Sequence, residues 1–231
     1  MSTVRIKFKK EGSAKYISHL DLIRTIQRAV RRADIPIEYT KGFNPHAKIS
    51  YGPALAVGMS SCGEYLDMEL NMEMGQSEMM ERLNNSLPPG IRVTAASAVP
   101  EDAPSLASMI DAAGYSIAGQ VKGQHEHSEE KLKDFFSLRH ALIQKTDKKG
   151  RKKQADIIPM ILEVEKILAG AGGVTLEVIL AVGSRANLKP AHLIKAIEQE
   201  TGIILEGVKI HRRELFVKNG QNYLSPLEIF N

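Results

Sequence analysis

Residues 15–48 read KYISHLDLIRTIQRAVRRADIPIEYTKGFNPHAK, and this stretch predicts a helix followed by an extended segment and a tight loop. Wound at about 100° per residue, its apolar side chains fall on one face and its arginines on the opposite face. The apolar face is expected to pack on a core, so the arginines should face solvent together. The arginines of this predicted outer face are Arg24, Arg28, Arg31 and Arg32.

The ends of the predicted helix carry clear signals. Ser18 is a favourable N-cap, and Asp21 three residues later approximates a capping box. Asp21 also places a carboxylate at the positive end of the helix dipole, and Pro36 marks a stop just beyond the helix. The same signals allow a plainer interpretation, in which the arginines form a solvated helix face with favourable end charges.

Charge is unevenly distributed along the chain. Residues 1–56 hold eleven Lys and Arg against four Asp and Glu, a net of +7. Residues 57–114 hold two against nine, a net of −7, and the remainder carries +4. Clustered cations without local carboxylates usually bind a polyanion, most often nucleic acid. The N-terminal quarter is therefore expected to contact phosphates.

The loop at residues 41–48 combines turn residues with donors. Gly42 permits positive φ, and Pro45 fixes φ, so the turn should be rigid. A rigid turn can offer an aromatic face for stacking and cations for phosphate. The alternative is a plain turn with its phenylalanine in the core. The candidate contacts of this loop are Lys41, Phe43, Asn44, His46 and Lys48.

The flanking patterns set the predicted fold class. Residues 4–9 and 35–40 are expected as strands around the helix, and a further strand, helix and strand follow up to residue 98. The resulting order β-α-β-β-α-β is the split βαβ unit of ferredoxin-like folds. The second half approximates the same order, with strands expected near 208–211 and 214–217. We therefore predict an α+β protein with two ferredoxin-like domains in tandem, at residues 1–99 and 115–231, joined by a linker at 100–114.

A second basic loop lies between strands expected at 141–146 and 160–168. Such charge runs are more often solvated tips than binding sites, although this one could lie along a nucleic-acid backbone. The cations of this secondary loop are Lys148, Lys149, Arg151, Lys152 and Lys153.

Catalytic signals are weak. His19 and His46 are candidates for general acid–base catalysis toward an RNA 2′-hydroxyl, and no phosphate-binding glycine motif or serine nucleophile motif is present. We predict no metal site and no cofactor. The single cysteine, Cys62, excludes an intrachain disulfide and suits a reducing compartment. With no apolar run of about 20 residues, the protein is expected to be cytoplasmic and off the membrane.

The motifs of residues 16–67 resemble the radical-SAM-linked protein family, a bacterial domain of unknown function found alone or attached to radical SAM proteins. The resemblance rests on Tyr16–Leu22, on the helix arginines, on Gly42–His46, and on Gly58–Asp67 with Ser61, Gly63, Glu64 and Tyr65. Ala47 and Tyr51 depart from it, standing where Pro and Phe are expected. The resemblance implies association with a radical SAM enzyme. Since the chain lacks a CxxxCxxC run, any iron–sulfur cluster would belong to that partner.

These observations predict an RNA-binding accessory protein that works with a radical SAM enzyme on tRNA or rRNA. Two alternatives stay open at this point. One is a metal-independent endoribonuclease using His19 or His46, which the fold-level similarity to CRISPR RNA-processing endoribonucleases also suggests. The other is a protein-interaction subunit that binds no nucleic acid. Whether the chain is an enzyme is left open.

Overall fold

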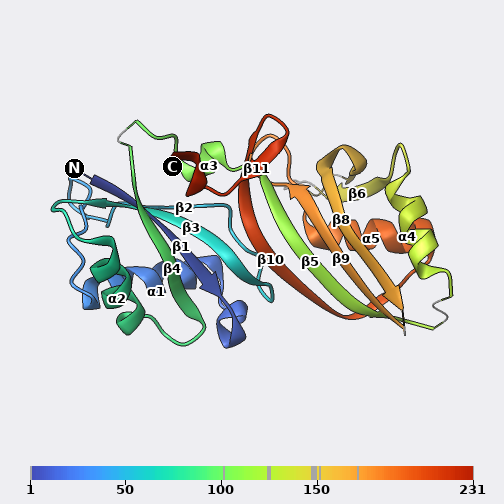
Figure 1. Ribbon diagram of the computed structural model, residues 1–231, viewed down its shortest axis with the longest axis horizontal. Coiled ribbons are helices and arrows are strands. Elements are labelled where there is room, and N and C mark those ends of the chain that lie inside the picture. The colour runs from blue at the N-terminus through green and yellow to red at the C-terminus, as the bar shows by residue number, and fades with distance from the viewer. Residues whose placement is uncertain are drawn as a thin grey trace. The chain divides into compact units, whose positions relative to one another are not determined.

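The computed structural model describes residues 2–100, 102–123, 126–146, 150, 152–170 and 172–230. It has an α+β architecture, with a large β-sheet and five α-helices in this part of the chain (Figure 1). The chain divides into two compact units: unit 1 is Met1–Asp111 with Arg212–Asn231, and unit 2 is Ala112–His211. Residues 212–231 thus belong to unit 1, whereas the sequence placed them in the second domain.

Unit 1 is built on antiparallel strands. β1 pairs with β3 on one side and with β4 on the other, and the short strand β2 also pairs with β3. The last strand, β10, begins in unit 2 and ends in unit 1, where it pairs with β11. The bounds of these strands are β1 Ser2–Lys10, β2 Ile49–Tyr51, β3 Ser60–Leu70, β4 Ile91–Val99, β10 Leu205–Asn219 and β11 Asn222–Leu224.

Two helices, α1 (His19–Arg32) and α2 (Gln76–Ser86), lie on the same side of these strands (Figure 1). Alternate residues of β1 point toward them, and Val4, Ile6 and Phe8 are all buried in one core with Leu22 and Ile26 of α1. The predicted alternation of the first strand is therefore confirmed. A short helix, α3 (Leu106–Met109), contacts β2 and β3 and lies within the stretch predicted as a linker.

Unit 2 has four strands in the order β10-β5-β9-β8, with β5 and β8 both antiparallel to β9. Strands β6 and β7 form a separate hairpin. The bounds are β5 Ala112–Val121, α4 Ser128–Phe136, β6 Leu142–Thr146, β7 Lys152–Asp156, β8 Ile161–Gly170, β9 Gly173–Ala181 and α5 Pro190–Thr201.

Three expected strands differ in the structure. Residues 35–40 form only isolated bridges, Ile37 to Leu70 and Tyr39 to Ala47, because Pro36 interrupts the run of amide donors. The segments near 208–211 and 214–217 are one continuous strand, β10. The strand expected at 160–168 is confirmed as β8 (Ile161–Gly170), but the strand that directly follows the second basic loop is β7 (Lys152–Asp156), which was not expected. Hydrophobic periodicity indicates extended chain, but pairing partners decide where a strand begins and ends.

Two buried ion pairs lie on opposite faces of the strands of unit 1. Arg5 donates through Nε and Nη2 to the two carboxylate oxygens of Asp67, at 2.8 and 2.9 Å. Arg212 donates through Nε to Glu64 at 2.8 Å, and the two side chains are 1% and 6% exposed. Glu64 and Asp67 therefore point to opposite faces of β3, as their spacing predicts.

Gly63 shows why β3 needs a glycine at this place. A Cβ built there would lie 2.6 Å from Cα of Glu214 and 2.9 Å from the carbonyl oxygen of Arg213. The backbone of β10 therefore approaches β3 too closely for any side chain at position 63. In the part of the chain that the structure describes, the helices are too short or too polar to cross a membrane.

Candidate nucleic-acid interface

The start of α1 is capped as the sequence predicts. Oγ of Ser18 accepts the backbone N–H of Asp21 at 3.1 Å and donates to the Asp21 carboxylate at 2.7 Å. The hydrogen bond from Ser18 is the largest influence that lowers the pKa of Asp21. On the face of the helix that packs against the core, Leu22, Ala29 and Val30 are buried. The cap and the packed face together hold the helix in a single orientation on the sheet.

The arginines on the outer face of α1 are all exposed. Arg24 lies 3.3 Å from the carboxylate of Asp21 and keeps 66% of its side chain exposed. Arg32 donates to the carbonyl of Ser86 at 2.6 Å. Arg28 and Arg31 have no ion-pair partner among the described residues, and none of the four pairs with the acidic segment 57–114 there. Their charge is therefore available to a ligand.

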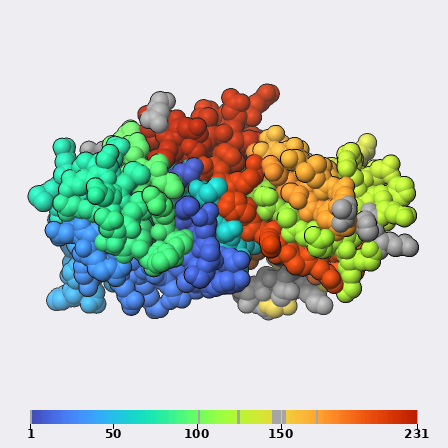
Figure 2. Space-filling view, turned by 60° about the horizontal axis from the view of Figure 1, so that its bottom comes forward, coloured from blue at the N-terminus to red at the C-terminus, as the bar shows by residue number. Residues whose placement is uncertain are grey.

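We use the name arginine stripe for Arg24, Arg28 and Arg31. With Leu20 they follow spacings of four, four and three residues, so they occupy one line along the helix surface. At 1.5 Å per residue, the line from Leu20 to Arg31 is about 16 Å long. In Figure 2 the N-terminal residues of the chain, which include α1, are coloured blue and form part of the surface of unit 1.

Exposed apolar side chains lie at the N-terminal end of the stripe, and the sequence reasoning missed them. Tyr16 and Leu20 are both 65% exposed, and Val57 is 58% exposed. The amide of Gly58 donates to the carbonyl of Lys15 at 2.8 Å, which brings residue 57 next to residue 16. The available signal was Leu20, an apolar residue on the polar face of the predicted helix.

The loop after α1 is a short hairpin with its tip in solvent. The amide of Thr40 donates to the carbonyl of His46 at 2.9 Å, and the amide of His46 donates to Oγ1 of Thr40 at 3.0 Å. Gly42 has a φ of +129°, which only glycine adopts readily. Phe43 is fully exposed, so the alternative that places it in the core is wrong.

The remaining loop candidates differ in their availability. Lys41, Asn44 and His46 are exposed. Lys48 instead lies 2.7 Å from the carboxylate of Glu69, and this hydrogen bond is the main cause that raises the pKa of its ammonium. Lys48 is therefore the member of the predicted set whose charge is neutralised within the fold.

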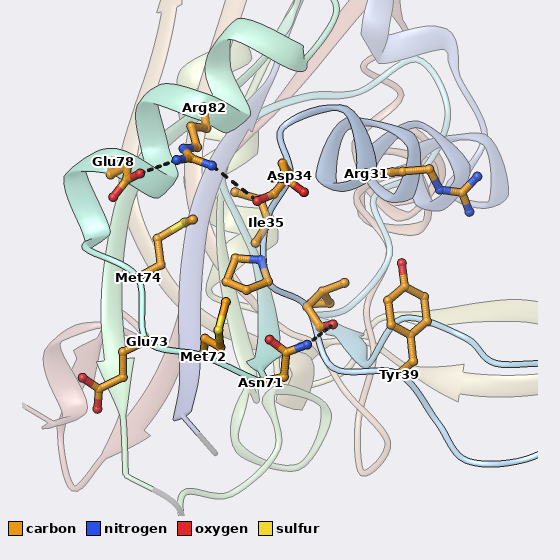
Figure 3. Close-up of a pocket in the computed structure, with 12 residues that line it drawn as sticks. Arg31, Asp34, Ile35, Tyr39, Asn71, Met72, Glu73, Met74, Glu78 and Arg82 are labelled. Carbon is orange, nitrogen blue, oxygen red and sulfur yellow. Dashed lines mark hydrogen bonds and ion pairs between the residues drawn. The ribbon is translucent and has the colours of Figure 1, made fainter.

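The helix and the loop meet at a pocket of about 580 Å³ at the C-terminal end of α1 (Figure 3). Arg31 lines this pocket from the helix, and Tyr39 lines it from the base of the loop. Arg28 and Arg24 lie one and two turns back along α1. The structure therefore brings the end of the arginine stripe next to the start of the loop.

The two candidate catalytic histidines lie on different elements. His19 is in the first turn of α1, with its ring edge-on to Tyr51 at 5.9 Å between centroids. The hydroxyl of Tyr51 is buried without a hydrogen-bond partner among the described residues, and burial raises its pKa. His46 lies in the exposed loop, and no interaction joins the two imidazoles in the described part of the chain.

The second basic loop is described only in part. Lys148, Lys149 and Arg151 lie outside the described residues. Lys152 begins β7, and Lys153 is exposed on the same strand.

Comparison with known proteins identifies one family match. Residues 3–190 match the profile of a family described as uncharacterised proteins conserved in bacteria (DUF2344). No curated protein matches the chain.

Solved structures resemble this chain to different degrees. A chain in the crystal structure of a Cbf5-Nop10-Gar1 complex has a TM-score of 0.51 at 13% identity, and the match covers 92% of this chain. It covers 48% of the other chain, so this protein spans about half its length. A protein of unknown function from Galdieria sulphuraria has a TM-score of 0.27 at 12% identity, with 94% of this chain and 99% of the other covered.

Proposed function

We propose that the chain, which belongs to this family of uncharacterised bacterial proteins, is an RNA-binding accessory protein that holds tRNA or rRNA along the outer face of α1. One observation carries the proposal. Arg24, Arg28 and Arg31 form a continuous exposed line of charge that the acidic segment of the same chain leaves unneutralised. A surface of this kind attracts a polyanion.

The spacing of the stripe suits successive phosphates of one strand. Neighbouring arginines lie about 4.5 to 6 Å apart along the helix axis, and each guanidinium can donate two hydrogen bonds to a phosphate. For a single strand, each neutralised phosphate contributes about −0.7 to the slope of log affinity against log salt. Three contacts therefore predict a slope of about −2.

The exposed aromatic rings add a contact that phosphate binding alone does not need. Phe43 is fully exposed at the loop tip, and Tyr39 is 41% exposed at the loop base. Unpaired bases stack on such rings, which is the usual way that proteins recognise single-stranded parts of structured RNA. The loop would thus hold bases while the helix holds the backbone.

The proposal includes a radical SAM enzyme as partner, and it rests here on the sequence resemblance. Cys62 is the only cysteine, so this chain cannot ligate a three-cysteine iron–sulfur cluster. In such a pair, this chain would supply RNA binding and the partner would supply the chemistry.

We also propose a ferredoxin-like unit in each half of the chain. In unit 1 the order β1-α1-β2-β3-α2-β4 along the chain gives neighbours β4-β1-β3-β2, supported by the antiparallel pairs of β1 and β2. In unit 2 the order β5-α4-β8-β9-α5-β10 gives neighbours β10-β5-β9-β8, with β6 and β7 inserted. Both orders fit the split βαβ motif.

The experiment measures binding of fluorescently labelled bacterial tRNA by anisotropy over a series of salt concentrations. We expect affinity to fall steeply with salt, and substitution of the arginine stripe by alanine to flatten the slope by about 2. The matched control replaces three exposed arginines on other elements, Arg92, Arg139 and Arg185, which changes the net charge equally. This control should leave the slope nearly unchanged.

Two outcomes would contradict the proposal. If tRNA and rRNA fragments fail to bind at low salt, the basic face does not serve nucleic acid and the protein-interaction alternative gains weight. If the control triple variant weakens binding as much as the stripe variant, binding reflects overall charge and no particular surface. The same labelled tRNA, examined for cleavage with the chain and with His46→Ala, tests the endoribonuclease alternative.

A further inference from the structure

The pocket at the C-terminal end of α1 carries features that phosphate binding does not explain. It lies between the end of α1, residues 34–39, the turn at 71–74 and the start of α2 (Figure 3). Its volume of about 580 Å³ falls within the range of small-ligand pockets, roughly 300–1,000 Å³. Arg31 stands at its edge and extends outward, away from Asp34 (Figure 3).

The floor of the pocket is apolar, whereas its lining as a whole exposes more polar than apolar surface. Ile35 and Ile37 are buried at its floor, and Pro36 lies between them. Tyr39 and Met72 form accessible walls, with 41% and 67% of their surfaces exposed. An apolar floor beside an aromatic ring suits a flat heterocycle better than it suits a phosphate or a sugar.

Two carboxylates that line the pocket, Asp34 and Glu73, have no cation to balance them among the described residues. Asp34 is exposed and lacks an ion-pair partner within the described part of the chain. Arg82, the nearby cation, donates to Glu78 at 2.6 Å and reaches only the backbone carbonyl of Asp34, at 3.5 Å. Asp34 therefore remains a hydrogen-bond acceptor for a ligand that offers N–H donors.

Aspartate is an uncommon residue for the left-handed backbone conformation at position 34. Its φ is +50°, and the amides of Asp34 and Ile35 donate to the carbonyls of Arg31 and Val30, the Schellman pattern that ends a helix. Glycine is the residue most favoured at that position. The chain has aspartate there, which places a carboxylate at the pocket next to the end of the stripe.

We propose that this pocket receives one unpaired base with an exocyclic amino group, such as cytosine, from the RNA strand bound along α1. The amino group donates to the Asp34 carboxylate, the ring lies against Tyr39, and the adjoining phosphate meets Arg31. Uracil lacks the amino group and offers a carbonyl oxygen there, which the carboxylate repels. This inference rests on the proposed RNA-binding function and specifies which bases the bound strand presents.

The test compares two labelled single-stranded RNAs, twelve cytidines and twelve uridines, whose rings differ in the group at C4, amino against carbonyl, and in the hydrogen at N3. We expect the wild-type chain to bind the cytidine strand about fivefold more tightly, the effect of one hydrogen bond. Asp34→Asn should remove most of this preference, because the cytidine strand loses a charged acceptor and the uridine strand no longer meets a repelling carboxylate. Asparagine also tolerates positive φ, so the variant keeps the helix end intact. Arg28→Ala should weaken both strands equally.

The outcomes separate this inference from the function on which it rests. Equal affinity of the wild-type chain for the two strands, each with a steep salt dependence, overturns the base pocket and leaves RNA binding in place. An increase in affinity for both strands in Asp34→Asn overturns it as well, because the carboxylate would then act only through its charge. Absence of binding to either strand and to tRNA at low salt overturns both proposals.

Discussion

Replacing Glu64 by glutamine tests the most deeply buried ion pair of unit 1. The change keeps the size of the side chain and removes one charge. Arg212 would then keep its hydrogen bond to the carbonyl of Pro53 at 2.9 Å and lose its charged bonds to the Glu64 carboxylate. Lys10, itself only 1% exposed, would lose the same negative neighbour. Two buried cations would thus lose the Glu64 carboxylate.

The expected loss is about 3–5 kcal/mol in the free energy of unfolding, the usual cost of leaving one member of a buried pair uncompensated. The matched control is Glu78→Gln. It removes the same group from the Glu78–Arg82 pair, whose side chains are 53% and 41% exposed. Exposed helix pairs four residues apart contribute about 0.3–0.5 kcal/mol. The two variants therefore differ in burial and share the chemical change.

The assay is urea unfolding followed by circular dichroism, with midpoints converted to free energies through the slope of each transition. Equal losses in the two variants, both under about 1 kcal/mol, would refute the reasoning from burial. A loss of at least 3 kcal/mol confined to Glu64→Gln would support it.

The pH dependence of this variant has a defined sign. Burial lowers the pKa of the Lys10 ammonium from 10.5, and the Glu64 carboxylate opposes that shift. Without Glu64 the folded-state pKa falls further, while the unfolded value is unchanged. Between these two values the unfolded chain binds more protons, so stability rises with pH. The deficit of Glu64→Gln should thus be largest below the folded pKa of Lys10 and shrink as pH approaches 10.5.

Ser18→Ala should lower the free energy of unfolding by about 1 kcal/mol, because the N-cap hydrogen bond at the start of α1 is lost. Thermal melting measures this change, and an unchanged melting temperature would show that the cap does not stabilise the protein. Gly63→Ala should lower the free energy of unfolding by about 1–3 kcal/mol or more, because the added Cβ would clash with the backbone of Glu214. Gly12→Ala, in open space at a φ of +55°, should cost about 1–2 kcal/mol. Burial raises the pKa of the Cys62 thiol, so its alkylation rate should keep increasing above pH 9, whereas the urea-unfolded chain should level off earlier.

The helix that begins at His19 was predictable because its determinants are local. The cap at Ser18, the charge of Asp21 and the apolar spacing lie within one short stretch, and each acts through bonds or contacts three or four residues apart. The prediction that its arginines face solvent followed from the same period. The structure agrees at Arg24, Arg28, Arg31 and Arg32.

The loop was predictable only in part. Gly42 and Pro45 indicate a turn whatever surrounds them. Whether Phe43 packs inward, and whether Lys48 keeps its charge free, depends on neighbours elsewhere in the chain. Lys48 pairs with Glu69 on β3, and local pattern carries no information about that partner.

The sequence by itself determined the capped helix, its polar and apolar faces, the turn that follows and the alternation of the strands, since these depend on the geometry of a few adjacent residues. The tertiary structure alone decided that Glu64 meets Arg212 across 148 positions, that residues 35–40 fail to form a strand, and that Arg31 and Tyr39 border one pocket. Strand pairing and burial bring distant residues together, and their energies depend on partners that no local period encodes.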